Sequence, residues 1–113
     1  MIYCFDIDGT LCTQTDGNYD NAIPIQHRID IVNSLYENGN TIYLLTARGM
    51  TRSKNNTAIA YGEMYSLTKE QLSKWGLKYH MLFLGKPKAD YYIDDKAMID
   101  TKFFHDGSSE AGS

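Results

Sequence analysis

The sequence has 113 residues, of which 42% are hydrophobic and 22% are charged, and its formal net charge at pH 7 is -3. These values are typical of one globular domain, and they exclude a long disordered chain or a basic surface that coats nucleic acid. No apolar stretch is long enough to cross a bilayer, and the acidic N-terminus lacks the regions of a signal peptide, so we expect a cytoplasmic protein without membrane contacts.

The first predicted elements are a strand and a helix, separated by a polar loop. Residues 1–5 have strand composition, and the stretch 13–22 is polar and rich in Gly, Asn and Asp. Apolar residues then recur at helical spacing after Pro24, at Ile25, Ile29, Val32, Leu35 and Tyr36. The sequence Asn-Gly-Asn at 38–40 is typical of a helix C-terminus.

The second half of the chain predicts three more strands. They cover 41–45, 80–84 and 91–93, and a capping-box pattern at 68–71 predicts a helix that begins at Thr68 and stops at Gly76. No period is clear over 49–62. Alternation of strands and helices predicts an α/β fold, a three-layer α/β/α Rossmann-like core with a mostly parallel sheet covered on both faces. We expect one catalytic domain over 1–106 and a disordered tail over 107–113.

Polar side chains follow each predicted strand, at the edge where a parallel sheet places its ligand site. They are Asp6 and Asp8, Thr46, Lys86 after Gly85, and Asp94 with Asp95. Clustered carboxylates without a nearby His or Cys are the ligands that Mg²⁺ prefers. The sequence therefore predicts a Mg²⁺ site at this edge.

Such an edge suits phosphoryl transfer. With a cation compensating the charge, one aspartate can attack phosphorus, and the aspartate two residues on can handle protons for the leaving group and for water. Thr46 and loop amides would hold the phosphoryl oxygens, and Lys86 would neutralise the charge that remains.

The four segments FDIDGT, LLTAR, GKP and YIDD, in this order, resemble the motifs of the haloacid dehalogenase (HAD) superfamily of phosphohydrolases. The resemblance implies that Asp6 is the nucleophile that forms an aspartyl-phosphate and that Asp8 is the general acid and then the general base. It implies substrate binding by Thr46, Ala47, Arg48 and Lys86, with Thr46 and Lys86 acting in catalysis. It also implies a metal site formed by Asp6, the backbone carbonyl of Asp8, Asp94 and Asp95.

The same resemblance implies a phosphomonoesterase without a cap domain, because neither segment between motifs is long enough to hold one. An open site in this superfamily usually means either a bulky substrate or a homo-oligomer whose neighbour supplies a lid. The stretch KYHMLFLGKPKADYYIDDKA is similar to small phosphatases of capsule or surface-polysaccharide biosynthesis, which implies a sugar phosphate or a related phosphorylated metabolite as substrate. The alternatives are a non-catalytic or regulatory binding module and a phosphatase that acts on nucleotides or polynucleotide ends; nucleic acid is not the expected partner.

Several residues keep a second interpretation. Lys86 is favoured over Lys88 as the lysine of the third motif, because it stands between Gly85 and a proline that fixes the backbone. A basic segment with Arg48, Arg52 and Lys54 is interpreted as a solvated loop rather than as a second anion site. Asp94 and Asp95 also suit the start of a short helix over 96–99. We expect Cys4 to be buried in a strand and Cys12 to lie in a loop.

Overall fold

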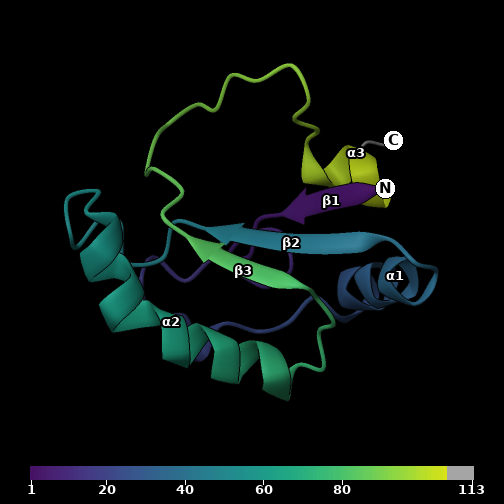
Figure 1. The fold of residues 1–113 in the computed structure, drawn as a ribbon, viewed down its shortest axis with the longest axis horizontal. Helices are drawn as coiled ribbons and strands as arrows, with labels where there is room; N and C mark the ends of the chain where they lie inside the picture. The colour runs from purple at the N-terminus through teal and green to yellow at the C-terminus, as the bar shows by residue number, and fades with distance from the viewer. Residues whose placement is uncertain (107–113) are drawn as a thin grey trace.

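Three short parallel strands form the sheet in this computed structural model, which describes residues 1–106 (Figure 1). The strands are β1 (Ile2–Phe5), β2 (Thr41–Thr46) and β3 (Met81–Leu84), and they lie side by side in chain order. Phe5 pairs with Leu44, and Thr46 pairs with Leu84. All three strands therefore end at the same edge of the sheet, as predicted.

The helices are η1 (Tyr19–Asn21), a short 3-10 helix, then α1 (Gln26–Glu37), α2 (Thr57–Lys74) and α3 (Asp100–Phe104). The predicted position of α1 is confirmed, and so is its stop. Gly39 has a φ of +90°, and its amide donates to the Tyr36 carbonyl at 3.1 Å, while the Asn40 amide donates to Leu35 at the same distance. A left-handed residue ends the helix in this way, and glycine adopts it without strain.

Helix α2 begins eleven residues earlier than the capping-box pattern indicates. The Asn56 side chain accepts a hydrogen bond from the Ile59 amide and caps the helix at Thr57. Thr68 is fully buried in the middle of the helix, so its predicted role as the cap is wrong. The first half of α2 shows no clear helical period in the sequence, because the helix buries only four residues, at Ala60, Met64, Thr68 and Leu72. One of the four is a threonine, which matches the first position of a capping box.

The core lies on one face of the sheet. Along β2 the buried residues alternate with half-buried ones, and Ile42 and Leu44 belong to one cluster with Val32 of α1 and Leu72 of α2. Both long helices therefore pack against the same face. The other face is more exposed, with Met81 at 47%, so the two faces that we expected to be covered are covered unequally.

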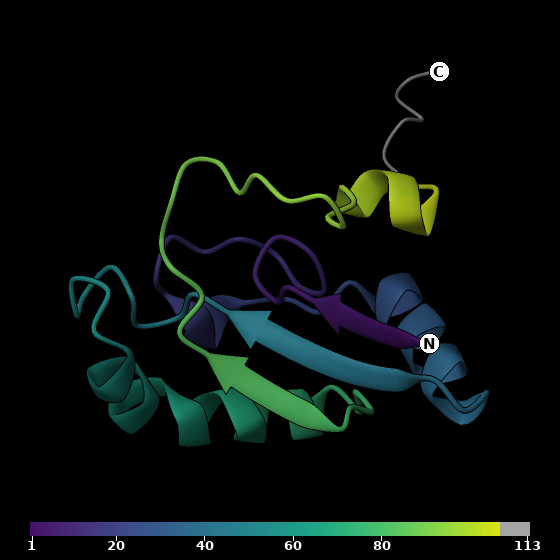
Figure 2. The ribbon, with the colours of Figure 1, turned by 45° about the horizontal axis from the view of Figure 1, so that its top comes forward.

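The fourth predicted strand, 91–93, is wrong: among the described residues the sheet has three strands. The chain leaves β3 at Gly85, arches away from the sheet and returns at α3 (Figures 1 and 2). Tyr91 and Ile93 are 85% and 99% exposed. This segment forms hydrogen bonds with nearby residues instead of pairing with a strand. The Tyr92 hydroxyl donates to the Pro87 carbonyl at 2.5 Å, and the Lys96 amide donates to the Asp94 side chain at 2.9 Å.

Helix α3 begins four residues later than the predicted helix at 96–99, and a buried arginine attaches it to the rest of the domain. The Arg28 guanidinium donates to Asp106 through Nε at 2.7 Å and Nη2 at 2.6 Å, and to Asp100 through Nη1 at 2.6 Å. Nη1 also donates to the Thr10 carbonyl at 3.0 Å. Arg28 therefore connects α1, α3 and the loop after β1.

The predicted fold class is confirmed: the chain forms a Rossmann-like α/β core, and residues 1–106 contain no cap domain. Within that range, none of the helices combines the length and the apolar character that a membrane span requires. The tail predicted for 107–113 lies outside the described residues.

Candidate active site

Asp6 and Asp8 stand at the end of β1, on either side of Ile7. Ile7 is fully buried, and its carbonyl accepts from the amides of Thr10 and Leu11 at 3.0 and 2.8 Å, which turns the chain back tightly after the strand. The Asp6 side chain is 35% exposed, and that of Asp8 is 12% exposed. The two aspartates therefore share one turn but meet solvent to different degrees.

Asp6 is held by its own loop and by Lys86. One carboxylate oxygen accepts from the Ile7 amide at 2.8 Å, and the other lies 3.5 Å from Lys86 Nζ. Burial raises the pKa of Asp6 above its ordinary value, and the ammonium of Lys86 opposes part of that rise. The Asp6 carboxylate is thus a poorly solvated anion with one exposed side.

Lys86 reaches Asp6 from the end of β3. Its amide donates to the Thr46 carbonyl at 3.2 Å, and its ammonium also lies 4.3 Å from the centre of the Tyr92 ring. Lys88 lies elsewhere, because its amide donates to the Asn55 side chain at 3.0 Å and its own side chain is exposed. Of the two lysines, the geometry places Lys86 beside the predicted nucleophile.

Thr46 is the last residue of β2 and is 1% exposed. Its hydroxyl oxygen accepts from the Arg48 amide at 3.1 Å, so the hydroxyl hydrogen stays available to an acceptor in the site. Ala47 is half-buried at the start of the same turn. Both residues stand at the end of the central strand, between the ends of β1 and β3.

Arg48 is buried, at 1% exposure, which corrects the interpretation of its segment as a solvated loop. Nε donates to one oxygen of Asp8 at 2.8 Å and Nη2 donates to the other at 2.9 Å. The donors of Arg48 face Asp8 and Thr68, so its side chain is enclosed by the protein itself, and its predicted contact with substrate stays a prediction. Arg52 remains exposed, 4.0 Å from Glu63.

The surroundings of Asp8 include residues that the sequence did not single out. The Tyr19 ring lies 4.6 Å from the Arg48 guanidinium, and Thr68 accepts from Arg48 Nη1 at 3.3 Å. Cys12 lies in the loop after β1, as expected, where it is fully buried and its thiol donates to Asp8 at 3.5 Å. Cys4 lies in β1 but is exposed, so its predicted burial is wrong. Burial raises the pKa of Cys12 to about 12, which keeps its thiol protonated.

Asp94 and Asp95 are not brought to this edge. Both are exposed, and they lie in the segment that arches away from the sheet (Figure 2). Over residues 1–106, no three His, Cys, Asp or Glu side chains gather closely enough to hold a metal ion. The predicted convergence is therefore formed for Asp6, Asp8, Thr46 and Lys86, but not for the acidic pair of the fourth motif.

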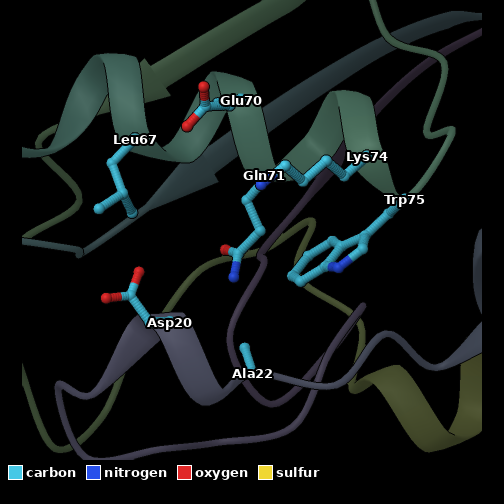
Figure 3. Close-up of a pocket in the computed structure, with 7 residues that line it drawn as sticks. All are labelled: Asp20, Ala22, Leu67, Glu70, Gln71, Lys74 and Trp75. Carbon is cyan, nitrogen blue, oxygen red and sulfur yellow. The ribbon is translucent and has the colours of Figure 1, made fainter.

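A cavity of about 220 Å³ lies between η1 and the C-terminal half of α2 (Figure 3). None of the predicted site residues lines it; its walls are Asp20, Ala22, Leu67, Glu70, Gln71, Lys74 and Trp75. One of its lining residues contacts a neighbour of the site: Gln71 Nε2 donates to the Tyr19 carbonyl at 2.8 Å. Tyr19 in turn covers Arg48.

Solved structures of other proteins share this fold. A crystal structure of a Vibrio cholerae protein superposes with a TM-score of 0.84 at 26% sequence identity, over 98% of this chain and 93% of that one. D,D-heptose 1,7-bisphosphate phosphatase from B. bronchiseptica, complexed with magnesium and phosphate, superposes with a TM-score of 0.52 at 18% identity, over 99% of this chain and 64% of its own.

A chain of the Pnkp1/Rnl/Hen1 RNA repair complex superposes with a TM-score of 0.55 at 17% identity, over 96% of this chain and 30% of its own. The chain has a HAD-like fold. It spans less than two thirds of the heptose bisphosphate phosphatase and of the RNA repair protein. No protein-family model and no curated protein matches the sequence.

Proposed function

We propose that the protein is a Mg²⁺-dependent phosphomonoester hydrolase with Asp6 as the nucleophile and Asp8 as the acid and base. The observation that carries the proposal is the difference between the two aspartates: Asp6 is partly exposed and lies beside Lys86, whereas Asp8 is enclosed and held by Arg48. One environment suits attack on a ligand from solvent. The other suits a group that moves protons from a fixed direction.

The reaction follows in two steps. A carboxylate oxygen of Asp6 attacks phosphorus, the bond to the leaving oxygen breaks, and Asp8 gives that oxygen a proton. Water then attacks the aspartyl-phosphate, Asp8 takes the proton of the water, and the bond from phosphorus to Asp6 breaks to release inorganic phosphate. The Thr46 hydroxyl, the Ala47 amide and the Lys86 ammonium would hold the phosphoryl oxygens and offset the charge that develops on them.

The donors at the strand ends fit Mg²⁺ in part. Mg²⁺ usually binds one or two protein carboxylates and takes further oxygen ligands from water and phosphate, and the poorly solvated carboxylate of Asp6 is such a donor. We propose that Asp6 and the backbone carbonyl of Asp8 hold the ion, with Asp94 or Asp95 added from the segment after β3. When bound, the ion would neutralise charge on the phosphoryl group.

For the substrate we propose a sugar phosphate or another phosphorylated metabolite of surface-polysaccharide synthesis. The sequence resemblance to capsule phosphatases supports this class, and so does the fold shared with an enzyme that acts on heptose 1,7-bisphosphate. The RNA repair protein of the same fold supports a second candidate, a phosphatase for nucleotides or polynucleotide ends. The position of Asp94 and Asp95 away from the other predicted site residues supports a third candidate, a binding module without turnover.

The open edge of the sheet leaves the site without a cover in residues 1–106. We propose that either the substrate itself or a neighbouring copy in a homo-oligomer covers it, and that the protein acts in the cytoplasm. Sedimentation of the purified protein with and without phosphate would measure the oligomer.

A substrate panel tests the function. Sugar phosphates, nucleotides, phosphorylated polynucleotide ends and an aryl phosphate are each incubated with the protein, with and without Mg²⁺, and released phosphate is measured. We expect the fastest turnover on a sugar phosphate, a loss on adding EDTA, and no turnover for Asp6→Asn. The matched control Asp30→Asn changes an exposed carboxylate on α1 and should leave the rates unchanged. Turnover by Asp6→Asn would contradict the mechanism, and the absence of turnover on every substrate would favour the binding module.

A further inference from the structure

Arg48 is a charged residue of the site whose side chain is shielded from solvent, and its guanidinium binds the carboxylate of Asp8. Its side chain is fully buried, and two of its nitrogens donate to the two oxygens of Asp8 at 2.8 and 2.9 Å. A paired contact of this kind fixes the plane of the carboxylate as well as its position, because the guanidinium is rigid and planar.

Arg48 is itself fixed by two other elements. The Thr68 hydroxyl, from the middle of α2, accepts from Nη1 at 3.3 Å, and the Tyr19 ring of η1 lies 4.6 Å from the guanidinium carbon. Gln71 of α2 then binds the Tyr19 backbone at 2.8 Å. The direction of the Asp8 carboxylate is therefore set by α2 and η1 as well as by the turn after β1.

We propose that Arg48 is a positioning residue, which aims the Asp8 carboxylate at the leaving oxygen and at the attacking water without contacting either. The proposal rests on the function proposed above. Its alternative is that Arg48 only stabilises the fold by compensating a nearly enclosed carboxylate. The two differ in kinetics, because a positioning residue acts through Asp8 and loses its effect when Asp8 can no longer transfer protons.

A double-mutant cycle separates these roles. Arg48→Lys, Asp8→Asn and the double variant are compared with the wild type for kcat and KM on the best substrate of the panel. Lysine keeps the charge but cannot bind both oxygens in a fork. We expect Arg48→Lys to lower kcat by on the order of 10²-fold with little change in KM, since acid and base catalysis contributes about 10² to 10⁴. In the Asp8→Asn background the same change should lower kcat by no more than about 2-fold.

Two measurements guard the result. Arg52→Lys is the matched control, because Arg52 is an exposed arginine of the same segment and its change should leave kcat unchanged. Thermal unfolding of each variant shows whether it is folded, and kcat is compared at a temperature where all variants are folded. For Arg48→Lys, both the formation of the aspartyl-phosphate and the release of phosphate from it should be slow, and rapid quenching followed by mass spectrometry measures the two steps separately.

The outcomes distinguish the two proposals. Equal losses from Arg48→Lys with Asp8 present and with Asp8→Asn would overturn the positioning role and leave a structural one. A raised KM with unchanged kcat would overturn it in favour of direct substrate binding. Full kcat in Arg48→Lys would overturn it too. If Asp6→Asn turns over as fast as the wild type, or the wild type turns over no substrate, the proposed function fails and this inference fails with it.

Discussion

Replacement of Arg28 by methionine should destabilise the domain strongly, although its side chain contacts none of the proposed catalytic residues directly. Methionine keeps an apolar side chain but removes the guanidinium, with its hydrogen bonds and its contact with the Phe104 ring, whose centre lies 4.8 Å from the guanidinium carbon. Arg28 has an 8% exposed side chain, and its partners Asp100 and Asp106 are 27% and 19% exposed. Breaking a buried ion pair costs about 3–5 kcal/mol, and because these carboxylates keep some water we expect the lower end, about 3 kcal/mol.

The assay is reversible thermal and urea unfolding, followed by far-ultraviolet circular dichroism. For a domain of this size 1 kcal/mol shifts Tm by about 4 °C, so Arg28→Met should unfold about 12 °C below the wild type. Arg52→Met is the matched control: its guanidinium is 74% exposed, and its free energy of unfolding should change by less than about 0.5 kcal/mol. A Tm for Arg28→Met within about 2 °C of the wild type would refute the view that Arg28 joins α3 to the core.

Three further outcomes are expected. Gly85→Ala should lower the free energy of unfolding by about 1–3 kcal/mol in urea, because Gly85 has a φ of +99° and an added Cβ would lie 2.9 Å from Thr57 Cγ2. In a Thr57→Ala background the clash is relieved while the strain of the positive φ remains, so equal costs in both backgrounds would exclude the clash. The hydrogen bonds from Arg28 hold the pKa of Asp106 below its ordinary value, so the contribution of the Asp106 carboxylate to stability is complete above about pH 4 and is lost as the pH falls through the lowered pKa. The Tm difference between the wild type and Asp106→Asn should shrink as the pH falls over that range, and a constant difference would argue against this linkage. Mg²⁺ at about 100 times its Kd should raise the free energy of unfolding by about 2.7 kcal/mol, measured by thermal unfolding at increasing Mg²⁺. The double variant Asp94→Asn, Asp95→Asn should lose most of that gain, and an unchanged gain would exclude both residues as ligands.

Local patterns in the sequence predicted the parts of the structure that depend on neighbouring residues. The strands at 1–5, 41–45 and 80–84, the helix after Pro24 and its stop at Gly39 all follow from composition and spacing within a few residues. The polar groups at the strand ends followed as well, because a parallel sheet brings the ends of its strands to one edge.

The parts that were missed depend on contacts between distant segments. Arg48 is buried because Thr68, twenty residues later, and Tyr19 of η1 surround it, and a basic segment taken alone gives no sign of this. The segment 91–93 has strand composition, but a strand also needs a partner, and no composition supplies one. Thr68 matched a capping pattern while lying at a buried helical position, so tertiary packing overrode the local signal.

The site divides into two parts that depend on different segments. Asp8 and Arg48 are held by α2 and η1, and they are complete without a ligand. Lys86, Asp94 and Asp95 all belong to the single segment after β3, of which only Lys86 reaches Asp6. Changes in that segment should therefore alter cation and phosphate affinity, while changes at Arg48 should alter proton transfer at constant affinity. Two aspartates in one turn can thus take different roles because different parts of the chain surround them.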